Sequence, residues 1–193
     1  MPKNPLPQSD VRVTVVLDCL VYLLKQNPSM DRILTQIKTK VYDPCELEIF
    51  GFRFEKESKE YDASQFKLNG LKIINRNAKV TPKKVGQFVT FWKRSKNGPI
   101  EPFHENDPFK FFTVNVQANN QLGQFVFPKS VLIKKGIIST NHKEGKRAFR
   151  VYPAWKMPKS KQGERTQKWQ LDFFYHINDS IDFDRVKELY GTK

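Results

Sequence analysis

Acidic residues are missing from a long central part of this chain. Between Ala63 and Ile100 there is no Asp or Glu, although the whole sequence holds 20 acids, and the same stretch carries nine basic residues. A second stretch, from Lys129 to Lys168, has twelve basic residues against Glu144 and Glu164. These two basic blocks together hold more than the net charge of +14, so the rest of the chain is acidic. Polyanions bind where Lys and Arg gather, because each neutralised phosphate releases counterions. The charge distribution therefore predicts a nucleic-acid partner.

Cysteine is scarce, and long hydrophobic runs are absent. Cys19 and Cys45 are the only cysteines, which excludes a disulfide framework and a four-cysteine zinc site. The longest apolar stretch, Val13 to Leu24, is interrupted by Asp18 and is too short to span a bilayer. The first ten residues contain no apolar signal core. We therefore expect a cytoplasmic protein without a membrane span.

The apolar content is nevertheless high enough for a folded chain. Hydrophobic residues make up 38% and aromatic residues 13% of the 193 residues. That composition can offset the entropy of ordering the chain, and the length suits one domain. We expect a single domain over residues 1–193, with the proline-rich residues 1–9 as a frayed tail.

The hydrophobic spacing predicts helices near both ends and strands between them. Asn69-Gly70 and Asn119-Asn120 lie between apolar runs and are typical of hairpin turns. Gly86-Gln-Phe-Val recurs as Gly123-Gln-Phe-Val, which indicates two similar strand starts in one sheet. The expected fold class is α/β or α+β, with a single mixed, mostly antiparallel sheet flanked by helices. The expected helices cover 10–26, 29–40, 128–135, 166–177 and 181–190, and the expected strands 47–54, 65–68, 71–74, 85–92, 111–116, 123–127 and 146–152.

Four ordered blocks resemble the MepB-like family. They run from Lys79 to Arg94, from Gly123 to Leu132, from Gly145 to Trp155 and from Thr166 to Gln170, and the similarity extends over residues 61–174. The resemblance implies a restriction-endonuclease-like fold, in which a helix, a run of mostly antiparallel strands and a further helix follow one another. It also implies nucleic-acid binding.

A nuclease of that fold would hold Mg²⁺ between acidic residues beside a lysine. Glu57-Ser-Lys59 and Glu144-Gly-Lys146 fit the acid-x-Lys pattern, but about three such triplets are expected by chance in a chain this rich in acids and lysines. The candidate catalytic or metal-binding residues are Glu57, Asp107 and Gln124. Because the central strands lack acids, we expect no metal and no intact catalysis, and keep a Mg²⁺-dependent nuclease as the alternative.

Residues near strand ends are the candidates for nucleic-acid binding. Arg can grip a phosphate with two hydrogen bonds, Lys acts as a point charge, and Trp beside them can stack on bases. Trp92 and Trp155 can equally belong to the core, as we expect of Trp169. The predicted binding residues are Lys83, Lys84, Trp92, Lys93, Arg94, Lys129, Lys146, Arg147, Arg150 and Trp155.

The polar segment from Lys156 to Lys168 is predicted to be a mobile loop that acts as a basic flap on DNA. Deleting it should flatten the salt dependence of binding. The leading hypothesis is non-specific binding of duplex DNA without cofactor or catalysis. A third hypothesis is an interaction module that docks on an acidic protein or a membrane surface. The sequence leaves DNA against RNA, and the oligomeric state, open.

Overall fold

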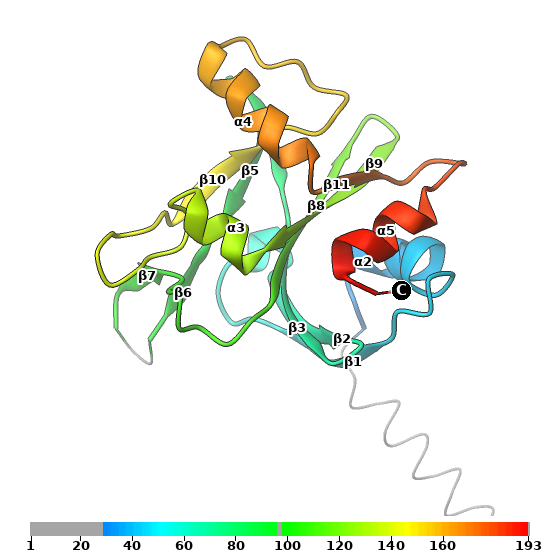
Figure 1. The fold of residues 1–193 in the computed structure, drawn as a ribbon, viewed down its shortest axis with the longest axis horizontal. Coiled ribbons are helices and arrows are strands. Elements are labelled where there is room, and N and C mark those ends of the chain that lie inside the picture. Colours follow the sequence, from blue (N-terminus) through cyan, green and yellow to red (C-terminus); the bar gives the residue numbers. More distant parts are fainter. Residues whose placement is uncertain (1–28, 96–97, 193) are drawn as a thin grey trace, which may run out of the picture.

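A six-stranded sheet divides the molecule into two layers (Figure 1). The structure is a computed structural model and describes residues 29–95 and 98–192. The strand order is β1-β2-β3-β8-β9-β11, and all neighbours are antiparallel except the central pair β3 and β8. The strands are β1 Ile49–Phe54, β2 Ser64–Leu68, β3 Leu71–Asn77, β8 Phe111–Ala118, β9 Gln121–Pro128 and β11 Phe174–His176.

Two tight hairpins build the middle of this sheet. β2 and β3 are joined by Asn69 and Gly70, whose φ angles are 47° and 83°. β8 and β9 are joined by Asn119 and Asn120, with φ angles of 48° and 62°. Positive φ at both central residues matches the twist of paired strands, and Asn and Gly adopt it at little cost. Both predicted hairpins are confirmed.

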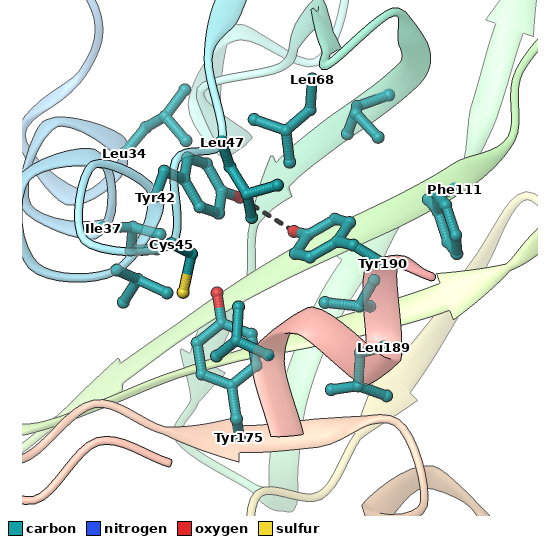
Figure 2. Close-up of a cluster of buried hydrophobic side chains, with 14 of the residues drawn as sticks. Leu34, Ile37, Tyr42, Cys45, Leu47, Leu68, Phe111, Tyr175, Leu189 and Tyr190 are labelled. Carbon is teal, nitrogen blue, oxygen red and sulfur yellow. Dashed lines mark hydrogen bonds between the residues drawn. The ribbon is translucent and has the colours of Figure 1, made fainter. Parts of the chain in front are cut away.

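Helices from the two ends of the described chain cover one face of the sheet. They are α2 (Arg32–Ile37), which continues as a π-helical turn from Lys38 to Tyr42, and α5 (Phe183–Tyr190). Asp31 caps the start of α2, and Asp182 caps the start of α5. α5 ends at Gly191 in the left-handed conformation, as predicted. Their apolar sides pack with strand residues into the core shown in Figure 2.

The opposite face carries a second core, rich in phenylalanine. It lies between the large sheet and a three-stranded sheet of order β10-β5-β4, together with two helices. β6 and β7 form a separate two-stranded sheet beside it (Figure 1). The elements are β4 Lys79–Thr81, β5 Lys84–Thr90, β6 Trp92–Arg94, β7 Ile100–Pro102, α3 Lys129–Lys134, β10 Ala148–Val151 and α4 Lys161–Leu171.

The predicted mixed and mostly antiparallel sheet with flanking helices is confirmed. The prediction of a single sheet is wrong, because the chain also forms a three-stranded and a two-stranded sheet. Three further details of the prediction are wrong. The Gly-Gln-Phe-Val segments lie in different sheets, since Gly86 belongs to β5 and Gly123 to β9. The predicted loop 156–168 is helical from Lys161, where Ser160 caps α4, and the helix expected up to Ile177 ends at Leu171 and gives way to β11.

Some predictions fall on residues that the structure does not describe. The helix expected over 10–26, the tail 1–9 and Cys19 all lie outside the described residues. Cys45 is described and is a buried free thiol. No helix within residues 29–95 and 98–192 is long and apolar enough to cross a membrane.

Candidate nucleic-acid interface

A groove of about 460 Å³ lies between β10, α4 and the end of α3. Its walls come from the second basic block of the sequence and the two residues that follow it, with Lys84 from the first block at its border. Among residues 29–95 and 98–192, no Asp or Glu lines it. We call it the basic groove, and its main lining side chains are Lys84, Lys135, Lys146, Phe149, Trp169 and Gln170.

Gln170 ties the two walls of the basic groove together. β10 is the edge strand of its sheet, so part of its backbone has no neighbouring strand. The buried Gln170 side chain of α4 accepts from the Tyr152 N–H and donates to the Arg150 carbonyl, both at 2.9 Å. These bonds satisfy edge groups that would otherwise be unpaired, and they fix α4 beside the strand.

Three lysines of the basic groove carry uncompensated charge. Lys84, Lys135 and Lys146 are exposed, and none forms an ion pair with any residue that the structure describes. The Lys135 ammonium lies over the Trp169 ring, 5.1 Å from its centre. Arg150 also borders the groove, but its guanidinium donates to Gly86 O at 3.2 Å and to Thr81 Oγ1 at 2.8 Å. The lysines are therefore the cations best placed to meet an anion.

Three of the other predicted binding cations face acidic side chains instead. Lys93 contacts Asp107 at 2.5 Å, and Arg94 contacts Glu57 at 2.7 Å. Arg147 pairs with Glu144 at 2.8 Å, as residues three apart in the chain. Lys129 donates to the backbone carbonyl of Asp107 at 2.6 Å. The charges of Lys93, Arg94 and Arg147 are therefore partly compensated within the protein, which weakens their attraction for a phosphate.

The predicted aromatic and turn residues are dispersed. Trp92 is half-buried, with the Arg94 guanidinium 5.8 Å from its ring centre. Trp155 is half-buried against Phe174, at a ring distance of 5.6 Å. Lys83 is exposed in the turn between β4 and β5. The structure thus brings Lys84, Lys146 and Arg150 to one groove and leaves these three residues outside it.

Two lining residues of the groove were missed by the sequence reasoning. The sequence gives no reason to select Lys135, and it predicts a core position for Trp169, which does pack against the second core. Trp169 is half-buried, with one side against Phe127 at a ring distance of 5.5 Å. Lys135 lies in the second basic block and Trp169 directly follows it, so the charge distribution indicates the region but not the individual positions.

The three catalytic candidates bind different partners and are not gathered in one place. Glu57 accepts from Arg94. Asp107 accepts from Lys93 and from the His104 N–H. Gln124 is 0% exposed in the middle of β9. Among the residues that the structure describes, no group of three or more His, Cys, Asp or Glu side chains is placed to hold a metal ion.

Gln124 instead anchors a buried tyrosine cluster. Its side-chain carbonyl accepts hydrogen bonds from the hydroxyls of Tyr42, Tyr175 and Tyr190, at 3.0, 2.6 and 2.8 Å. Figure 2 shows these rings converging from the π-helical turn, β11 and α5. The Gln124 amide donates to Asn115 at 2.7 Å, which extends the network across the sheet. The network joins both end helices to the central strands.

Burial gives this cluster a strong dependence on alkaline pH. It raises the pKa of Tyr42 to about 12 and the pKa values of Tyr175 and Tyr190 well above the ordinary value of 10.0. A phenol with a raised pKa in the folded state stabilises the fold fully below the unfolded pKa, and this contribution is lost as pH rises. We expect the free energy of unfolding to fall steeply between pH 10 and 12, as urea unfolding would measure. Tyr42→Phe should make the fall shallower, and an unchanged slope in that variant would contradict the assignment.

Comparisons with known proteins place the chain in a family. The family model described as MepB-like matches residues 55–176. A crystal structure of MepB is 32% identical, with a TM-score of 0.68, over 78% of this chain and 100% of that one. A bacterial homing endonuclease, I-Ssp6803I, matches at 18% identity and a TM-score of 0.35, over 63% of this chain and 77% of its own, which is too distant to carry an argument. No curated protein matches. The extent of the family match and the identity to MepB show that the chain belongs to the MepB-like family.

Proposed function

We propose that this protein binds nucleic acid without sequence preference, with duplex DNA as a ligand, through the basic groove and the surface around it. The observation that carries the proposal is the set of three exposed lysines, Lys84, Lys135 and Lys146, in a groove without any lining acid. Phosphates follow one another at regular spacing along a nucleic acid, so a row of separate ammonium groups suits them.

The proposed binding requires neither metal nor bond cleavage. Lysine–phosphate contacts gain their free energy mainly from released counterions, and each contact makes the binding constant fall with salt. Arg147, next to Lys146 in the chain, already faces Glu144 and would add less. Contacts of this kind position the phosphate backbone and do not read bases.

Fluorescence anisotropy of a labelled duplex of about 30 base pairs, over a series of salt concentrations, tests the proposal. We expect binding that weakens as salt rises, with a slope in log K against log salt of at least about 2.7 in magnitude if all three lysines engage. Replacing Mg²⁺ by EDTA should not weaken the binding, because Mg²⁺ acts here only as a competing counterion.

The same samples, run on a denaturing gel, should contain intact DNA. DNA that is cut in the presence of Mg²⁺ and stays intact with EDTA would overturn the proposal that the protein binds without catalysis. Absence of binding at low salt, together with tight binding to an acidic peptide or to anionic vesicles, would overturn the nucleic-acid partner itself.

A further inference from the structure

The basic groove is too small to enclose a duplex. Its volume of about 460 Å³ is that of a small-ligand pocket, which spans roughly 300–1,000 Å³. The major groove of B-DNA alone is about 12 Å wide and admits a whole α-helix, so the complete duplex is broader still. The walls of the basic groove are instead linked by the 2.9 Å hydrogen bonds of Gln170. A duplex can lie against the rim, but only an unpaired strand fits inside.

Trp169 offers the groove an aromatic face. The indole is half-buried and belongs to the groove lining. The Lys135 ammonium stands 5.1 Å from the ring centre, so part of the ring is covered by the end of a flexible, exposed side chain. Every base has a flat face that can stack on an aromatic ring, and such stacking tolerates any sequence.

Resting on the nucleic-acid binding proposed above, we infer that the basic groove takes an unpaired strand, with one base stacked on Trp169. The base replaces the Lys135 ammonium over the indole, and the displaced ammonium contacts a phosphate. Lys146 and Lys84 contact the neighbouring phosphates. The preferred ligand is therefore DNA with a single-stranded tail, rather than a blunt duplex.

The test compares a blunt duplex with the same duplex carrying a tail of about 10 thymidines, by competition at equal total phosphate. The tailed DNA should bind about tenfold more tightly, the gain expected from one base–aromatic stack. Trp169→Leu should reduce this advantage and leave blunt-duplex binding nearly unchanged. Lys135→Gln should also reduce the advantage, and it should weaken blunt-duplex binding only by the one phosphate contact that is lost. Lys135 is exposed, so its variant keeps the test valid if Trp169→Leu unfolds, which thermal unfolding would reveal.

Fluorescence gives a second readout. With Trp92→Phe and Trp155→Phe, Trp169 is the only tryptophan left of the three. The thymidine tail should quench its emission, whereas the blunt duplex should not. Salt-dependent duplex binding without any tail advantage would overturn the inference and leave the proposed function standing. Failure of both DNA forms to bind would overturn the inference and the proposed function together. A tail advantage that survives Trp169→Leu, combined with no quenching in the protein that keeps Trp169 alone, would place the strand elsewhere.

Discussion

Replacing Lys84, Lys135 and Lys146 together by Gln should lower the affinity for duplex DNA at low salt on the order of 10- to 100-fold and reduce the salt slope by about three, one for each lysine. The physical reason is that each of these ammonium groups is exposed and has no acidic partner among the described residues. Anisotropy titrations at several salt concentrations measure both quantities.

A matched variant controls for net charge. Lys40, Lys59 and Lys67 are also exposed and lie outside the basic groove, so changing all three to Gln removes the same charge elsewhere. This control should leave most of the affinity and most of the salt slope. Equal losses in the two triple variants would mean that DNA is attracted by the protein's overall charge, and the groove would lose its assigned role.

Glu55→Ala should destabilise the fold by about 3–5 kcal/mol, measured by urea unfolding. Arg76 on β3 is 0% exposed, and its guanidinium contacts Glu55 at 2.5 Å and the Asn75 carbonyl at 2.9 Å. Burial lowers the pKa of Arg76, and the nearby Glu55 carboxylate opposes this shift and favours the charged form. Removing Glu55 would leave a buried charge without compensation.

Two further variants separate burial from charge pairing. Glu57→Ala removes a similar contact to Arg94, but both side chains are more than a third exposed, so the loss should stay below about 1 kcal/mol. Glu55→Ala combined with Arg76→Met removes the stranded charge and should recover much of the stability. A double variant as unstable as Glu55→Ala alone would show that the lost charge pairing is not the cause.

Local features of the fold could be predicted from the sequence. Asn69-Gly70 and Asn119-Asn120 specify their turns through backbone conformations that these residues adopt readily. α5 carries its own start and stop signals in Asp182 and Gly191. The start of α4 is not predicted from the sequence, and the reason is also local. Gly163 is the third residue of the helix, and the poor helix propensity of glycine outweighs the capping signal of Ser160.

Features that depend on distant partners could not be predicted. Nothing near β5 in the sequence says that it pairs with β10, so a second small sheet was not foreseen. Arg76 reads as one more cation of the first basic block, yet it is buried because Glu55 happens to lie beside it. Gln124 is a catalytic candidate in the sequence because its structural role is not visible there. The three tyrosines that enclose it come from distant segments of the chain. The basic blocks indicate the region of the candidate site. The shape of the groove and the position of Trp169 in its lining depend on how α4 packs, which the sequence does not show.

The parallel pairing of β3 with β8 bears on the order in which the chain folds. The β2–β3 and β8–β9 hairpins are local and can form early. Bringing β3 against β8 requires closing the long segment that contains β4 to β7. β5 can pair locally with β4, but their sheet is completed only when β10, which lies far along the chain, has joined it. Closing each of these chain segments costs conformational entropy before the contacts between the strands stabilise the fold. The basic groove depends on β10 and α4, so it assembles after the hairpins, and a growing chain cannot form it until the residues up to Leu171 have been synthesised.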